Sequence, residues 1–172
     1  DNNKLLSLPE FHFGNLDTLT VSGNGLISFN ITASTLSTLV LDRNNLTVLD
    51  ITNHPNIKNL WAARNNLETM NFGGVSQLEA LISVNNHYEG NNNFSSLGNG
   101  VFPKLTQLLV ENNKLTSLGT PNWPALEHLN YVNSAINLDN NLLDGNTVIA
   151  ALINTTVNPQ IKSIDLRENP LG

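Results

Sequence analysis

The side chains of this sequence that could carry acid–base or metal chemistry are few and far apart. The histidines are His12, His54, His87 and His128, and no two have the spacing of a helical metal-binding motif. Cysteine is absent, which excludes a thiolate zinc site, a disulfide and a cysteine nucleophile. No Gly-x-Ser-x-Gly elbow, phosphate-binding loop or dinucleotide fingerprint occurs. We therefore predict no catalytic residue, no metal and no cofactor, and we expect the histidines to lie on a solvated surface.

Carboxylates close to a glycine give residues 139–145 a faint likeness to a calcium-binding loop. The glycine stands at the seventh position of this segment, whereas calcium loops have it at the sixth. The bidentate glutamate that ends such loops is also missing. The segment therefore fails the pattern, and we predict no calcium site.

The composition excludes several classes of partner. Polarity comes mainly from 31 asparagines, while the net charge of the 172 residues is -6 and the 8 Lys and Arg residues are scattered. Nucleic acids and anionic membranes are bound mainly by clustered Lys and Arg, so neither is expected as a partner. No apolar run approaches the roughly 18 residues that span a bilayer, which predicts that there is no transmembrane segment.

An internal repeat predicts the elements that must position any site. Residues 36–46 match the pattern L-x-x-L-x-L-x-x-N-x-L at every position, and residues 57–67 and 105–115 are further copies. Weaker copies begin at residues 16, 78, 126 and 161, and residues 3–8 are the back half of another. The asparagine position falls at residues 3, 24, 44, 65, 86, 113, 134 and 169, and five of the seven intervals are 20 or 21 residues. This pattern is that of a leucine-rich-repeat solenoid.

Each repeat is expected to contribute one short strand and one structural asparagine. The x-L-x triplet around the second leucine forms the strand, and stacked repeats pair these strands into a parallel sheet over a continuous core. The asparagine lies where the chain turns inside the solenoid, and its amide satisfies backbone groups that would otherwise be buried without partners. The predicted ladder consists of Asn24, Asn44, Asn65, Asn86, Asn113 and Asn169, with Ser134 in the remaining full repeat.

The two irregular intervals locate insertions. Residues 89–100 are rich in Gly and Asn, which predicts a loop. The second insertion lies near residues 140–159, where apolar residues at 148, 149, 152 and 153 follow helical spacing and predict one short helix near residues 144–154. The predicted fold class is an α/β solenoid, a single leucine-rich-repeat domain of residues 1–172 with about seven or eight repeats. We expect a right-handed horseshoe with a concave parallel sheet of about seven short strands and an extended, irregular or 3₁₀ convex side.

A candidate binding surface follows from the repeat geometry. The residue after the inward leucine of each strand should face the concave side, and four consecutive repeats have an apolar residue there. These residues, which we call the apolar strip, are Val40, Trp61, Ile82 and Leu109. An apolar patch bordered by polar groups commonly marks an interaction site, and tryptophan is a frequent anchor. The predicted partner-binding residues are the strip together with Asp42, Arg64, Gln107 and Glu111 of its border.

Residues 45–60 resemble the roughly 21-residue repeats of leucine-rich-repeat surface proteins from Bacteroidetes. Residues 143–152 resemble a helical segment that often follows such repeats, and residues 89–100 depart from the regularity of that family. The resemblance implies an exported bacterial protein, extracellular or at the cell surface, that takes part in adhesion or binds host or glycan partners. It leaves open a lipid anchor ahead of residue 1. The family has no catalytic motif to carry over.

The leading hypothesis from the sequence is a non-catalytic adhesion module that binds a protein partner through its concave sheet, with Trp61 as anchor. The first alternative is a glycan-binding module in which Trp61 stacks on a sugar, although a sugar site usually presents more than one aromatic residue. The second is a structural spacer or dimerisation domain whose apolar strip packs within the assembly. An enzyme is disfavoured because the concave positions offer only scattered titratable groups such as His128 and Asp165.

Overall fold

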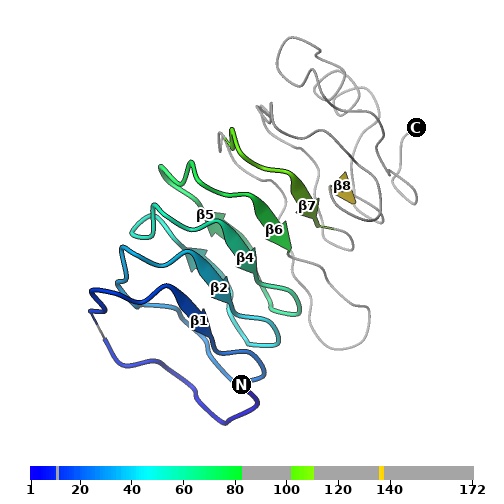
Figure 1. Cartoon of the computed structure of the whole chain (residues 1–172). Helices are drawn as coiled ribbons and strands as arrows, with labels where there is room; N and C mark the ends of the chain where they lie inside the picture. Colours follow the sequence, from blue (N-terminus) through cyan, green and yellow to red (C-terminus); the bar gives the residue numbers. More distant parts are fainter. Residues whose placement is uncertain (11, 83–101, 111–135, 138–172) are drawn as a thin grey trace, which may run out of the picture.

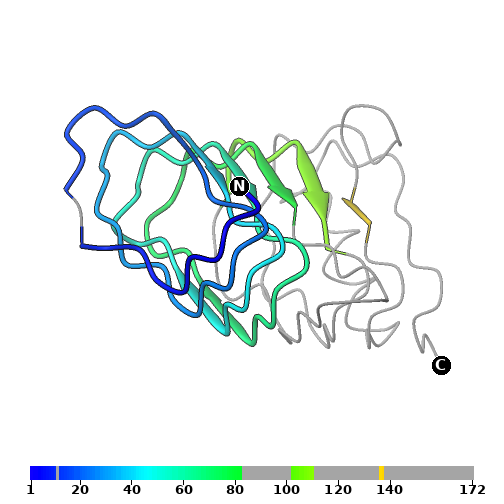
Figure 2. The same ribbon diagram turned by 90° about the horizontal axis from the view of Figure 1, so that it is seen from below.

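The computed structural model describes residues 1–10, 12–82 and 102–110, and the backbone of residues 136–137. Over these residues the chain winds as a solenoid in which each turn places a short strand beside that of the turn before (Figure 1, Figure 2). Six strands form one parallel sheet in the order β1-β2-β4-β6-β7-β8. They are β1 (Thr18–Thr20), β2 (Thr38–Val40), β4 (Asn59–Trp61), β6 (Ala80–Ile82), β7 (Gln107–Leu109) and β8 (Ile136–Asn137). The prediction of a parallel-strand solenoid is confirmed.

One row of leucines sets the register of this sheet. Successive members pair across neighbouring strands and are 20, 21, 21 and 27 residues apart; they are Leu19, Leu39, Leu60, Leu81 and Leu108. All but Leu19, which lies in the first strand of the sheet, have no exposed surface. A regular turn therefore takes about 21 residues. Because side chains alternate across a strand, a row that points inward leaves the residues on either side of it facing outward.

A second, smaller parallel sheet lies across the core from the first. Strand β3 (Val48–Asp50) pairs with β5 (Thr69–Asn71), and the amide of Asn71 donates to a carboxylate oxygen of Asp50 at 3.1 Å. In β3 the central leucine is buried while Val48 is 53% exposed, which is the alternation of a strand with one solvated face. The sequence predicts an extended, irregular or 3₁₀ backbone on this side, and the extended form is the one observed at β3 and β5. The described residues contain no 3₁₀ turn, because the two stacked turns satisfy each other's backbone groups in extended form.

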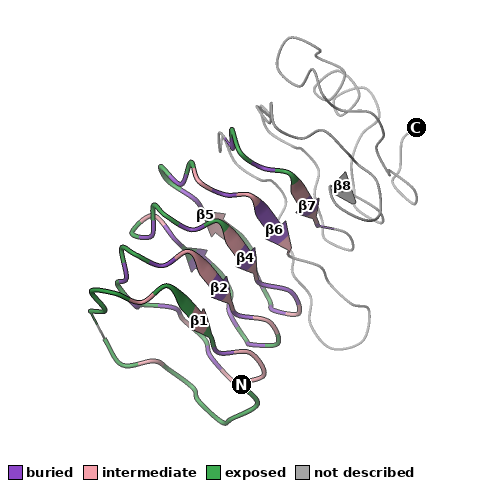
Figure 3. Cartoon of the chain, in the orientation of Figure 1, coloured by how far each residue is buried: buried purple, intermediate pink, exposed green. Residues whose placement is uncertain are grey.

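A single apolar core fills the space between the two sheets. Buried residues recur at the same places in successive turns, so the colouring by burial in Figure 3 repeats along the solenoid. Phe102 is fully buried and contacts Phe72 edge to face, with ring centroids 5.0 Å apart. This contact joins the turn before residues 83–101 to the turn after them, and it continues the core across the insertion.

The predicted asparagine ladder is visible in three turns as a set of hydrogen bonds between neighbouring repeats. The Asn65 amide accepts from the Leu46 N–H at 3.2 Å and donates to the carbonyls of Leu41, Ala62 and Ala63 at 3.0, 3.2 and 3.2 Å. Asn44 makes the equivalent bonds one turn earlier. Asn24, a further turn earlier, accepts from the Leu5 N–H and donates to the carbonyls of Val21 and Ser22 in its own turn. Asn65 and Asn44 are buried, whereas Asn24 in an outer turn is half-buried. The other predicted members, Asn86, Asn113 and Asn169, lie outside the described residues.

His54 is buried in the core, 1% exposed, and the expectation that it lies on a solvated surface is wrong. Its Nδ1 lies 3.1 Å from the carbonyl oxygen of Ala33, and its ring is 5.5 Å from that of Phe29. The physical reason is its place in the repeat, three residues before the first leucine. In other turns this core position is filled by Ala33, Val75 and Phe102. His12, in contrast, is exposed as expected.

The strand after β7 does not fall where the repeat pattern predicts it. The pattern centres that strand on Leu129, whereas Leu108 pairs with Ile136 and Leu109 with Asn137. Both Leu129 and Ile136 are apolar, so the hydrophobic pattern alone does not decide between them. In this repeat Ser134 replaces the asparagine whose amide fixes the register of the other turns, which removes the local signal that would have separated the two choices.

Several sequence predictions fall on residues that the structure does not describe. The helix near residues 144–154, the insertions near 89–100 and 140–159, and the last repeat lie outside the described residues. The described ranges contain no helix, and therefore no helix long and apolar enough to cross a bilayer. The single domain of seven or eight repeats stays a prediction.

Candidate functional site

The apolar strip lies in register on the outer face of the six-stranded sheet. Val40 is paired with Trp61, Trp61 with Ile82 and Ile82 with Leu109. The four side chains therefore stand on adjacent strands, spaced about 4.8 Å apart along the stacking direction. Each is partly exposed, because neighbours at this spacing cover one another's flanks. Thr20 of β1 pairs with Val40, so the apolar stretch is followed by a polar residue at the β1 end.

A second outward row runs parallel to the strip on the other side of the leucines. It consists of Thr18, Thr38, Asn59, Ala80 and Gln107. Thr38, Asn59 and Gln107 are half-buried, and the Asn59 amide lies 3.5 Å from the Thr38 hydroxyl. These side chains give the strip one polar border, and the structure places Gln107 in that border beside Leu109.

The opposite border of the strip is charged and begins at Asp42, two residues after Val40. Its carboxylate accepts a hydrogen bond from the Ala63 N–H at 2.9 Å, which ties β2 to the turn of β4. Burial raises the pKa of the Asp42 carboxyl above its ordinary value of 3.8. The hydrogen bond from Ala63 and the positive charges of Arg43 and Arg64 act in the opposite direction without cancelling the effect of burial.

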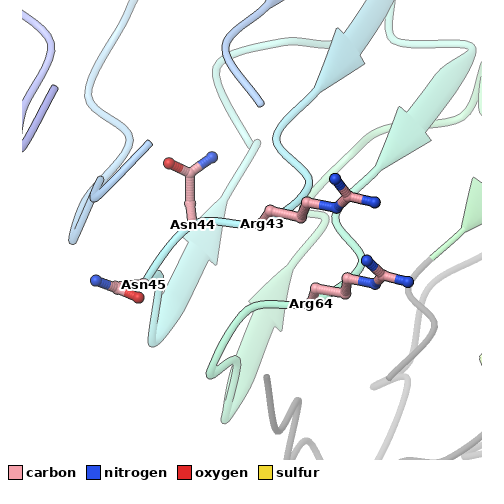
Figure 4. Close-up of a pocket in the computed structure, with 4 residues that line it drawn as sticks. All are labelled: Arg43, Asn44, Asn45 and Arg64. Atoms are coloured by element: carbon pink, nitrogen blue, oxygen red, sulfur yellow. The ribbon is translucent and has the colours of Figure 1, made fainter. Parts of the chain in front are cut away.

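Arg43 and Arg64 follow this border on successive turns. They line a hollow of about 250 Å³ together with Asn44 and Asn45. In Figure 4 the two arginine side chains extend in the same direction from adjacent turns, whereas Asn44 and Asn45 point elsewhere. The Arg43 N–H donates to the Ala63 carbonyl at 2.9 Å, so the backbone holds these turns in register directly beside the hollow. The sequence pattern predicted Arg64 as a border residue and missed Arg43 and Asn45.

The signal that could have found Arg43 is conformational rather than chemical. The residue before the ladder asparagine has a positive φ in four turns: Asn2, Gly23, Arg43 and Arg64 at 52°, 65°, 56° and 55°. Gly and Asn adopt this left-handed conformation readily, whereas other L-residues do so at a steric cost. The same left-handed backbone conformation therefore recurs at one position of the repeat, whether the residue there is Asn, Gly or Arg.

The described part of the chain contains no group of three or more His, Cys, Asp or Glu side chains that could hold a metal ion. Glu111, the remaining predicted border residue, lies outside the described residues. The described site therefore consists of an apolar row, an amide and hydroxyl row, and a border with one carboxylate and two guanidinium groups. Such an arrangement can bind a surface by burial of apolar area and by hydrogen bonds.

Replacing Asp42 with asparagine is expected to stabilise the chain near neutral pH. Asn retains an oxygen that can accept the Ala63 N–H but carries no charge to desolvate. Because the folded-state pKa of Asp42 is raised, its contribution to stability is fully present below the unfolded pKa and is lost as the pH rises through the folded pKa. The advantage of Asp42→Asn over the wild type should therefore shrink as the pH falls through the raised folded-state pKa, and it should be lost below the unfolded value of about 4. Urea unfolding at several pH values measures it, and a pH-independent difference would contradict this explanation.

No model of a protein family matches this chain, and no curated protein sequence or solved structure shows significant similarity to it.

Proposed function

We propose that the chain is a leucine-rich-repeat protein of the kind found on bacterial cell surfaces, and that it binds a protein partner through the outer face of its six-stranded sheet. In this proposal it is a non-catalytic adhesion or recognition module. The periodicity of about 21 residues, the parallel sheet and the asparagine bonds between turns support the assignment to leucine-rich repeats. The resemblance of residues 45–60 to Bacteroidetes repeats supports the location at the cell surface.

One observation carries the proposal: four apolar residues stand in register on four adjacent strands of a solvent-facing sheet. A solvated sheet face ordinarily has polar side chains, as the row through Thr38 and Asn59 does. The strip departs from that rule over four consecutive strands, and Trp61 lies within it. Tryptophan contributes strongly at interfaces because it buries a large apolar surface and can still donate a hydrogen bond.

The rows beside the strip fit the anatomy of a protein interface. Interfaces have an apolar centre and a polar rim that forms hydrogen bonds and excludes water from the centre. Asn59 and Gln107 lie along one side of the strip, and Asp42 with the two arginines lies along the other. The surface is therefore organised as a centre and a rim, with different chemistry on its two sides.

The experiment compares the wild type with Trp61→Ser/Ile82→Ser and with Val48→Ser, a control that removes an exposed apolar residue from the second sheet. Light scattering measures the oligomeric state, and retention of extracellular host proteins on the immobilised chain measures partner binding. We expect a monomer that retains a partner, with retention lost in the double variant and kept in Val48→Ser. A wild-type dimer that the double variant splits would instead make the strip an assembly surface. Equal behaviour of all three proteins would contradict the proposal.

A further inference from the structure

The outward row beside the apolar strip places two side-chain amides on either side of a small residue. Asn59 of β4 and Gln107 of β7 lie in this row, and Ala80 of β6 lies between them. Ala80 carries only a methyl group, so no long side chain separates the two amides. Neighbouring strands are about 4.8 Å apart, so two strands separate the amides by about 9.6 Å along the solenoid.

Both amides have hydrogen-bonding capacity that the described residues do not use. The Gln107 side chain is half-buried and makes no hydrogen bond to any residue of the described ranges. The Asn59 Nδ2 lies 3.5 Å from the Thr38 hydroxyl, which is the long limit of a hydrogen bond and occupies only one of its two hydrogens. Each amide can therefore donate to an acceptor that a partner supplies.

The electrostatic surroundings of the two amides favour an uncharged ligand. The amide row and the apolar strip contain no charged residue over the strands that pair β2 to β7. Lys58 and Glu79, which directly precede Asn59 and Ala80, pair with one another at 3.9 Å. The surface therefore complements a segment that has carbonyl acceptors and apolar side chains and carries no net charge.

The spacing of the amides distinguishes the backbone conformations that such a segment could have. Inside an α-helix the carbonyls already accept hydrogen bonds, so they offer nothing to the amides. In a β-strand equivalent groups recur every two residues, about 6.6–6.8 Å apart, which does not match about 9.6 Å. A polyproline II helix has three residues per turn, a rise of about 3.1 Å and no internal hydrogen bonds. Its carbonyls three residues apart face the same way at about 9.3 Å, which matches.

We propose that Asn59 and Gln107 bind the main chain of a proline-rich segment of a protein partner in the polyproline II conformation. The two amides donate to carbonyls three residues apart, and the proline rings between them pack against Trp61 and Ile82. Polyproline II segments dock on aromatic surfaces because their conformation is preformed and little entropy is lost on binding. This inference rests on the proposed function, since it names the chemistry of the partner that the apolar strip binds.

The test titrates acetylated and amidated decaproline into the chain and follows the side-chain amide signals of Asn59 and Gln107 and the indole signal of Trp61 by NMR. We expect saturable shifts of all three. Gln107→Met keeps the length of the side chain without its donor, and Asn59→Ala removes the other donor. Each should weaken decaproline binding by about fivefold, as loss of one hydrogen bond implies. Ala80→Leu should block binding by filling the space between the amides.

Two controls separate this inference from the proposed function. Asn66→Ala, which removes an exposed amide outside the row, should bind decaproline as the wild type does. The second control is a helical peptide of the same length with a leucine stripe. If that peptide bound in a way that Trp61→Ser/Ile82→Ser abolishes while decaproline did not bind, the polyproline assignment would be overturned and the strip would remain a recognition surface. Decaproline binding that is equal in the wild type, Gln107→Met and Asn59→Ala would overturn the role of the amides.

Discussion

Replacing Asn65 with alanine is expected to lower the free energy of unfolding by about 2–4 kcal/mol. The side chain has no exposed surface, and its amide satisfies one N–H and three carbonyls drawn from two turns. Alanine removes the acceptor of the buried Leu46 N–H and one donor from each of the three carbonyls, although the Leu41 and Ala63 carbonyls keep bonds from the Asn44 amide and the Arg43 backbone N–H. A buried polar group that loses its partner costs about 1–3 kcal/mol, and the lost packing of the side chain adds to this. A loss of this size is a large part of the stability of a typical domain. Urea unfolding followed by circular dichroism measures it.

The neighbouring residue supplies the matched control for this prediction. Asn66 is exposed, so Asn66→Ala should change the stability by no more than about 0.5 kcal/mol. Asn65→Asp keeps an acceptor for the Leu46 N–H but loses the donors to the carbonyls and buries a charge. It should therefore also be strongly destabilising. If Asn65→Ala and Asn66→Ala were equally stable, the hydrogen bonds between turns would not hold the solenoid together.

Replacing Leu60 with alanine is expected to cost about 3–5 kcal/mol, from lost apolar burial and the cavity left behind. Leu60 has no exposed surface and lies at the centre of β4, with Leu39 and Leu81 paired to it on the two neighbouring strands. Equilibrium unfolding in urea is the measurement. Leu19→Ala should cost less because β1 is the end strand of the sheet and its leucine is only half-buried.

Equal losses for Leu60→Ala and Leu19→Ala would contradict this account of the core. Val48→Ala is the surface control, since Val48 is 53% exposed and its truncation should matter by no more than about 0.5 kcal/mol. In a solenoid each turn contacts only its neighbours, so the gradient from the end strand to the inner strand is a direct consequence of the architecture.

The repeat pattern predicts the large sheet well because its leucines supply the buried apolar surface and its asparagines supply the hydrogen bonds between turns. Leu39, Leu60, Leu81 and Leu108 form the inward row, and the outward register of Val40, Trp61, Ile82 and Leu109 follows from alternation. The strip was therefore located from the sequence alone, down to which residues are neighbours. Periodicity places the strip but carries no information about the identity of the proposed partner.

The features that the pattern missed depend on contacts between turns. The second sheet forms because β3 and β5 stack and pair, which no single repeat reveals. His54 is buried because its repeat position is a core position, although histidine is a residue type common on surfaces. Arg43 and Arg64, which line the hollow, have positive φ values, and arginine is not a residue type from which that conformation is predicted. At β8 the sequence has Ser134 in place of the ladder asparagine, so the repeat pattern does not distinguish Leu129 from Ile136 as the residue paired with Leu108.

The central claim, that the apolar strip is a recognition surface, is tested most directly by the affinity of selected ligands. Peptides are selected for binding to the wild type from a random displayed library, and the dissociation constant of the best is then measured on three proteins. These are the wild type, Trp61→Ser/Ile82→Ser and Val48→Ser. The account predicts that the selected peptides have apolar centres. Their dissociation constant for the double variant should be about thirtyfold or more higher than for the wild type, because losing an interface anchor costs about 2 kcal/mol. Their dissociation constant for Val48→Ser should equal that for the wild type. Peptides that bind the wild type and the double variant equally would contradict it.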